Sequence, residues 1–222
     1  MGYLKYDLPT KVISWVIVMI YIGILGTIFL RRMRKADTEL VSQKLLYRSM
    51  GLVFYCYVMV RVFFLISDFE RDANNTTPLH YQFVAIGYIF TSLAFLNLLY
   101  FGEKFIIRKS KFILTYITIS VLIIESVLVF IPEMFIVVRL LSYGLSYALL
   151  GLVFILFLRM TIKSTGSLRR NFLFTLLGLS IIATSGILEI DALLSTGDIL
   201  PWISPLLFGA GATVVVIGLR NI

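Results

Sequence analysis

Seven apolar segments, each about as long as a membrane-spanning helix, constrain this chain more than any other feature of its sequence. A helix needs about 20 predominantly apolar residues to cross the hydrocarbon core of a bilayer. Only helices and closed barrels satisfy their whole backbone in lipid, and these runs are too long for barrel strands. The segments are Val12–Leu30, Ser49–Ile66, Tyr81–Gly102, Phe112–Ile131, Met134–Leu158, Asn171–Ile190 and Ile199–Leu219.

The composition agrees with a chain that is solvated by lipid. Of 222 residues, 59% are hydrophobic and only 14% are charged, whereas about a quarter of a soluble domain is charged. The net charge of +8 comes from basic residues at the ends of the apolar segments, so it is a signal of topology and gives no reason to expect a nucleic-acid partner. We therefore predict an all-α integral membrane bundle in which residues 1–222 form a single seven-helix domain without a soluble domain.

The connections between the segments alternate in charge. Residues 31–48, 103–111 and 159–170, together with Arg220, hold 15 of the 20 Lys and Arg but only three acids. The opposite flanks hold three basic residues and seven acids. Short loops rich in Lys and Arg stay in the cytoplasm. This pattern predicts a multi-pass protein of the cell membrane, with its N-terminus outside and its C-terminus in the cytoplasm.

Four charged side chains lie inside the apolar segments, in the third of each segment that is assigned to the outside. They are Arg61, Glu125, Arg139 and Glu189. Asp68 and Asp191 add acids at the rim, and helical spacing places Tyr57 on the face of Arg61 and Tyr143 on the face of Arg139. Ions inside a membrane are costly unless they are paired or hydrated. Three interpretations stay open: a polar ligand pocket that opens to the outside, structural ion pairs or snorkelling arginines, and a path for protons or ions.

Small residues mark two candidate packing faces, since helices in lipid associate through close packing of small side chains. One face of the fifth segment has Gly144, Ala148 and Gly151, and the seventh has Ser204, Gly211 and Gly218. Either stripe is explained by packing within the bundle or by the seam of a homo-oligomer. The connection expected outside also contains overlapping glycosylation sequons at Asn74 and Asn75.

The sequence lacks the residues that the common catalytic and cofactor-binding sites of membrane proteins need. No lysine lies inside a segment, so a retinal Schiff base is excluded. With His80 as the only histidine, bis-histidine haem and intramembrane zinc hydrolases are excluded as well. No phosphate-binding loop, dinucleotide fingerprint or kinase motif is present. We expect no enzymatic activity, no cofactor and no metal site.

The layout resembles that of the seven-span sensory modules that precede kinase domains in prokaryotes. The stretches Phe101–Lys111 and Leu200–Pro205 resemble corresponding parts of uncharacterised archaeal seven-span proteins. This resemblance implies a sensor or receptor, although we expect no output domain, and the sequence lacks the Asp-Arg-Tyr signature of G-protein-coupled receptors. The first hypothesis is therefore a receptor-like bundle that signals through a membrane or cytoplasmic protein partner. The alternatives are a non-catalytic subunit of a larger membrane complex and a carrier of small solutes or protons.

Overall fold

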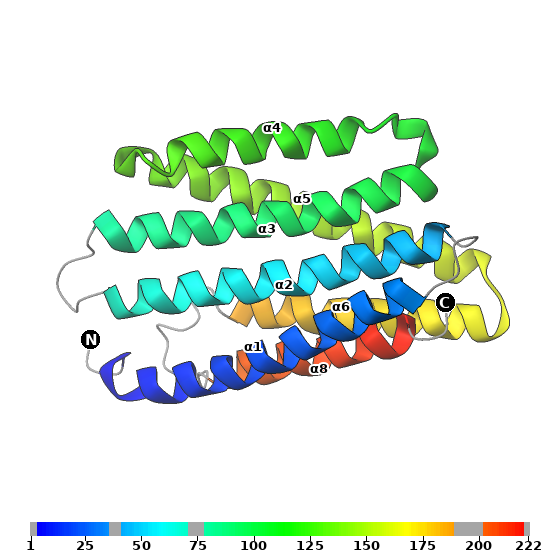
Figure 1. Cartoon of the computed structure of the whole chain (residues 1–222), viewed down its shortest axis with the longest axis horizontal. Coiled ribbons are helices and arrows are strands. Elements are labelled where there is room, and N and C mark those ends of the chain that lie inside the picture. Colours follow the sequence, from blue (N-terminus) through cyan, green and yellow to red (C-terminus); the bar gives the residue numbers. More distant parts are fainter. Residues whose placement is uncertain (1–3, 36–40, 71–77, 189–201, 220–222) are drawn as a thin grey trace. The chain divides into compact units, whose positions relative to one another are not determined.

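The computed structural model describes residues 4–35, 41–70, 78–188 and 202–219, and in these ranges the chain forms helices and no strand (Figure 1). The seven α-helices of the described ranges are α1 (Leu4–Lys35), α2 (Val41–Glu70), α3 (Pro78–Phe105), α4 (Ile113–Leu128), α5 (Phe135–Lys163), α6 (Gly166–Leu188) and α8 (Ile203–Leu219). Short 3₁₀ turns, η1 (Arg108–Ser110) and η2 (Pro132–Met134), flank α4.

The prediction of an all-helical architecture is confirmed, and each described helix falls on one of the seven apolar segments. Five helices (α1, α2, α3, α5 and α6) contain stretches that are long and apolar enough to cross a membrane. The other two, α4 with 16 residues and α8 with 17, are shorter. At 1.5 Å per residue, α4 is roughly 24 Å long, less than the hydrocarbon thickness of about 30 Å.

The backbone on both sides of α4 sets the ends of this short helix. Lys111 and Phe112 adopt left-handed φ angles of 47° and 64°, so the helix cannot begin before Ile113. At the other end the chain turns after Leu128 and passes through η2. Hydropathy counts these flanking apolar residues as part of a span, although their backbone is not helical.

The chain divides into two compact units, which are described separately. The terminal unit comprises Met1–Ile22 and Leu152–Ile222, and the central unit comprises Gly23–Gly151. Helices α1 and α5 contribute residues to both units.

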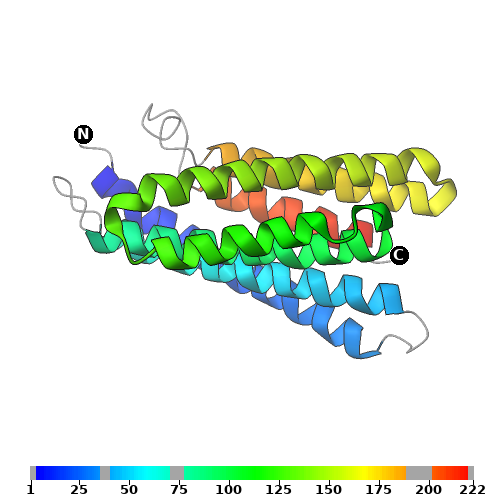
Figure 2. The same cartoon turned by 90° about the horizontal axis from the view of Figure 1, so that it is seen from above.

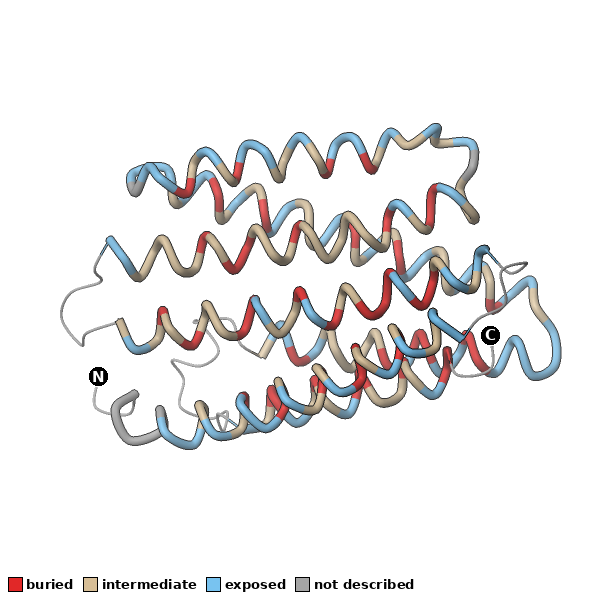
Figure 3. The backbone as a smooth tube through the Cα atoms, in the orientation of Figure 1, coloured by how far each residue is buried: buried red, intermediate tan, exposed pale blue. Residues whose placement is uncertain are grey.

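In the central unit, α3 lies between α2 and α4 (Figure 1). Figure 3 shows buried positions recurring at helical intervals along α2 and α3. Glycines permit the close approaches: a Cβ added at Gly51 would lie 3.2 Å from the carbonyl oxygen of Gly26 on α1, and one added at Gly87 would overlap the ring of Phe64. An apolar core of Ala85, Tyr88, Val129 and Val138 joins α3 to the residue that follows α4 and to the first turn of α5.

Glu103, near the end of α3, caps the start of α4. Its side chain is buried, and its carboxylate accepts hydrogen bonds from the backbone N–H groups of Leu114 (3.0 Å) and Thr115 (2.8 Å) and from the Thr115 hydroxyl. The first N–H groups of a helix have no partner within the helix, and a negative charge there is favoured by the helix dipole. Residue Phe112 at the N-cap supplies no side-chain bond, so a carboxylate from the preceding helix does so instead.

We expect Glu103→Gln to lower the free energy of unfolding by about 2 kcal/mol, because bonds to a charged acceptor contribute more than neutral ones. Reversible unfolding in mixed micelles measures this change. Glu133→Gln is the matched control, since Glu133 is exposed. Equal effects of the two substitutions would show that the cap contributes nothing.

In the terminal unit, α8 runs along α6, as both views show (Figures 1 and 2). A Cβ added at Gly211 would lie 2.8 Å from the carbonyl oxygen of Gly178, and one at Gly218 would lie 2.7 Å from the backbone of Thr175. Ser185 and Ser204 complete this contact, since each hydroxyl donates to the other residue's carbonyl, at 2.8 and 3.1 Å. The stripe of Ser204, Gly211 and Gly218 therefore packs within the chain.

The stripe on α5 is placed differently. Gly144, Ala148 and Gly151 are exposed, and a Cβ added at either glycine meets no atom of the described residues within 4 Å. The two stripes look alike in the sequence but have different surroundings.

Alanine at one glycine of each stripe gives a direct comparison. We expect Gly211→Ala to destabilise the protein by about 1–3 kcal/mol, because backbone atoms must move to admit the methyl group. Gly144→Ala should be neutral or stabilise by up to about 1 kcal/mol, because alanine favours the helix and meets no neighbour. Unfolding of the two variants in the same micelles checks the difference, and a larger loss for Gly144→Ala would contradict it.

Candidate functional site

The carboxyl group of Glu125 joins three helices of the central unit. Glu125 lies on α4 and is fully buried, with 0% of its surface exposed. Ser92 on α3 donates a hydrogen bond to Oε2 at 2.7 Å, and Ser142 on α5 donates one to Oε1. Both oxygens of the carboxyl group are therefore bonded by neutral donors from neighbouring helices. Within the described ranges, no arginine or lysine forms an ion pair with it.

The two serines behave unlike most hydroxyl side chains of these helices. Thr91 precedes Ser92, and Ser126 follows Glu125. Both donate to the carbonyl four residues earlier in their own helix, at 3.1 and 2.7 Å. Such local bonds satisfy a hydroxyl without any tertiary partner. Ser92 and Ser142 instead donate to Glu125. They do so in place of the bond to their own helix backbone that other hydroxyls of these helices make.

The site lies deep along α3. Ser92 is about half way along Pro78–Phe105, so the carboxyl group is level with the middle of that helix. Glu125 itself lies near the end of α4, which alone would suggest a position nearer the end of the bundle. The two helices differ because α4 is short and ends beside α3, where the ring centroid of Phe135, the first residue of α5, lies 4.6 Å from that of Tyr81.

Arg61, on α2, is surrounded by aromatic side chains. Although it is a charged residue, only 7% of its surface is exposed. Its Nε donates to the hydroxyl of Tyr57 at 2.8 Å, and its guanidinium carbon lies 5.0 Å from the Tyr57 ring centroid and 5.9 Å from that of Phe64. Cation–π contacts of this kind are strengthened where water is excluded.

Arg139, on α5, has a similar setting, and aromatic rings connect it to Arg61. Its guanidinium carbon lies 5.3 Å from the Tyr143 ring centroid. Tyr88 on α3 donates to the Tyr143 hydroxyl at 3.3 Å, and its ring centroid lies 5.7 Å from that of Phe64. We call these six residues the arginine–aromatic cluster: Tyr57, Arg61, Phe64, Tyr88, Arg139 and Tyr143.

The cluster and the Glu125 site are adjacent. Tyr88 and Ser92 are one turn apart on α3, and Ser142 precedes Tyr143 on α5. The structure thus brings Arg61, Arg139, Tyr57, Tyr143 and Glu125 into one region of the central unit, but the carboxyl group contacts serines and the guanidinium groups contact aromatic rings.

The remaining predicted residues lie elsewhere. Asp68 is half-buried in the last turn of α2. Near it, Nδ1 of His80 lies 2.8 Å from both the hydroxyl and the carbonyl oxygen of Ser67. Glu189, Asp191, Asn74 and Asn75 lie outside the described residues.

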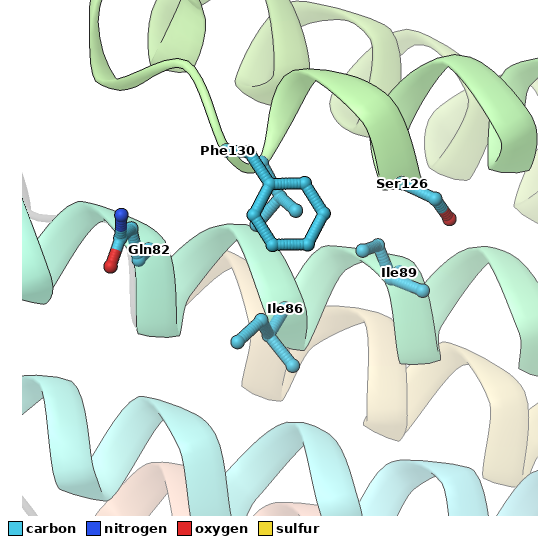
Figure 4. A pocket seen from close by; sticks show the side chains of 6 residues that line it. Gln82, Ile86, Ile89, Ser126 and Phe130 are labelled. Carbon is cyan, nitrogen blue, oxygen red and sulfur yellow. The ribbon is translucent and has the colours of Figure 1, made fainter.

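A groove of about 370 Å³ runs between α3 and the end of α4, and its lining is mainly apolar (Figure 4). It is lined by Gln82, Ile86, Ile89, Ser126, Val129 and Phe130, and by none of the charged residues predicted for a pocket.

Four residues of the site were not predicted from the sequence: Phe64, Tyr88, Ser92 and Ser142. Ser142 follows Arg139 by three residues, so its place on the same helix face was a usable signal. Ser92 lies in a segment without charge and offered no such signal.

No protein-family model, curated protein or solved structure matches this chain. The case for its function therefore depends on the chemistry of the site.

The bond between Tyr57 and Arg61 gives a test of the cluster. Tyr57→Phe removes the hydroxyl that accepts from Arg61 and should lower the free energy of unfolding by about 1.5–3 kcal/mol. Tyr116→Phe, at a position that is 64% exposed, should change it by less than about 0.5 kcal/mol. Chemical unfolding of both variants measures the effects, and a Tyr57→Phe protein as stable as the control would show that the hydroxyl is dispensable.

Proposed function

We propose that the chain is a receptor-like membrane sensor, with its N-terminus outside and its C-terminus in the cytoplasm, that binds its ligand at the arginine–aromatic cluster. The observation that supports this best is the buried Arg61, connected through three aromatic rings to Arg139 on another helix. Ionisable residues inside membrane helices are costly and mark functional sites by default.

The chemistry of the cluster indicates the class of ligand. Arginine binds carboxylate and phosphate groups through parallel hydrogen bonds, and aromatic rings hold an apolar or planar moiety beside them. We therefore propose a small solute that carries an anionic group. A ligand that moves Tyr143 would also move its neighbour Ser142 on α5. Because Ser142 bonds Glu125, the effect would reach α4. A sensor needs such a link between its ligand and the packing of its helices.

A second function is supported by the α5 stripe. The exposed Gly144, Ala148 and Gly151 offer a surface on which another membrane helix can pack closely. This favours an integral subunit of a larger complex as the alternative.

Thermal unfolding in lipid nanodiscs tests the receptor proposal with a panel of small carboxylates, phosphates, sulfonates and neutral analogues. We expect certain anionic solutes to raise Tm by about 3–6 °C at a tenfold excess over Kd. The shift should be lost in Arg139→Gln and retained in Arg159→Gln, a control on the exposed part of the same helix. If no anion shifts Tm and the protein is isolated in a fixed ratio with another protein, the subunit function replaces the receptor.

A further inference from the structure

The chemistry around Glu125 is that of an incompletely neutralised site. A carboxylate in an apolar bundle carries a full charge, and neutral hydrogen bonds do not remove the cost of burying it. The structure supplies two hydroxyl donors, from Ser92 and Ser142, and within the described ranges no side-chain cation is paired with the carboxyl group. A small cation is what such a site requires.

We propose that Glu125, Ser92 and Ser142 form a binding site for a small monovalent cation, a proton or a sodium ion, whose occupancy controls the packing of α4 against α3 and α5. The site offers four oxygens, two from the carboxyl group and two from hydroxyls. Oxygen ligands of this kind suit hard cations. The four oxygens come from three helices, two from α4 and one each from α3 and α5, so a bound cation draws these helices together.

Each serine has a second acceptor within reach of its hydroxyl, so it can stop donating to Glu125 when a cation binds. In the cation-bound form each hydroxyl turns its proton to the carbonyl four residues earlier, that of Tyr88 for Ser92 and that of Val138 for Ser142. Thr91 and Ser126 already make this bond. The lone pairs of the serines then face the carboxyl group, where they coordinate sodium or accept the proton of the neutral acid.

Among the described residues, few other titratable or charged groups lie near the site. They are Tyr88 on α3, Arg139 and Tyr143 on α5, and Arg61 on α2, which is connected to Tyr88 through the ring of Phe64. On α4 itself, Tyr116 is exposed and lies more than two turns away. Glu125 is therefore the group in this region whose charge a proton or sodium ion would balance, whether or not a ligand occupies the arginine–aromatic cluster.

The test is thermal unfolding of the full chain in nanodiscs at constant ionic strength. NaCl, KCl and N-methyl-D-glucamine chloride are compared from about pH 5 to about pH 9. If the cation is a proton, Tm falls as pH rises, equally in all three salts, because the folded protein binds a proton that the unfolded chain has released. If it is sodium, NaCl raises Tm at alkaline pH by about 3–6 °C at a tenfold excess over Kd, while the other salts do not.

Variants assign the response to the site. Glu125→Gln should abolish it, and Ser92→Ala or Ser142→Ala should weaken it. Ser126→Ala is the matched control, because the Ser126 hydroxyl bonds within its own helix, and it should respond like the wild type. A wild-type Tm that is indifferent to pH and sodium overturns the proposal, as does a Glu125→Gln variant that keeps the response.

A chemical measurement covers the case in which Glu125→Gln fails to fold. Dicyclohexylcarbodiimide adds to a protonated carboxyl group in an apolar setting, and peptide mass spectrometry identifies the labelled residue. Labelling of Glu125 in the wild type should decrease as pH rises, and sodium should protect it further if sodium binds. Labelling that is absent, or unaffected by both, counts against the site. The anion panel tests ligand binding at the arginine–aromatic cluster and does not depend on the cation experiments. Each proposal can therefore fail while the other stands.

Discussion

The hydrogen bonds that Glu125 accepts from Ser92 and Ser142 are the main polar constraint on the packing of α3, α4 and α5. In lipid, apolar burial does not select one helix face over another, because the surrounding chains are as apolar as leucine. A polar group in that setting has no water to turn to, so it must find its partners on neighbouring helices. One carboxyl group bonded from two directions therefore determines which faces of α3, α4 and α5 meet.

The same requirement is met by other means elsewhere. At the start of α4 the backbone N–H groups, which no residue of α4 can satisfy, are bonded by Glu103 of the preceding helix. In the terminal unit, Ser185 and Ser204 satisfy each other, and this pair forms because Gly178 and Gly211 let the two backbones approach. Close packing of glycine and bonding of buried polar groups thus act together, and each depends on the other.

Hydropathy was sufficient to predict the helices, because a membrane leaves few other conformations to an apolar run. It placed the start of α4 to within one residue, but it did not predict that the helix ends at Leu128, where the chain turns towards η2. The in-span charges located the region of the site, and helical spacing placed Tyr57 and Tyr143 beside their arginines. The partners of Glu125, which lie on other helices, could not be derived from spacing. A serine in a helix can satisfy itself on its own backbone, so nothing in the sequence distinguishes Ser92, which bonds Glu125, from Thr91, which does not. The two glycine stripes were also indistinguishable, since which of them meets a neighbouring backbone depends on tertiary structure.

The way in which Glu125 is bonded bears on the proposed function. Arginines lie in the same region of the central unit and could have formed an ion pair with it, yet among the described residues the carboxyl group is bonded by the hydroxyls of Ser92 and Ser142. The guanidinium groups of Arg61 and Arg139 lie beside aromatic rings. A direct ion pair inside a membrane would be expensive to break, and its charge would be fixed. Hydroxyls bind either form of a carboxyl group, because they both donate and accept. The two serines can therefore bond the carboxyl group in its charged or its neutral form, and Ser142 and Tyr143 keep it next to the region in which we propose a ligand binds. The proposed sensor would use such a change of charge at Glu125, which need not unfold the helices that hold it.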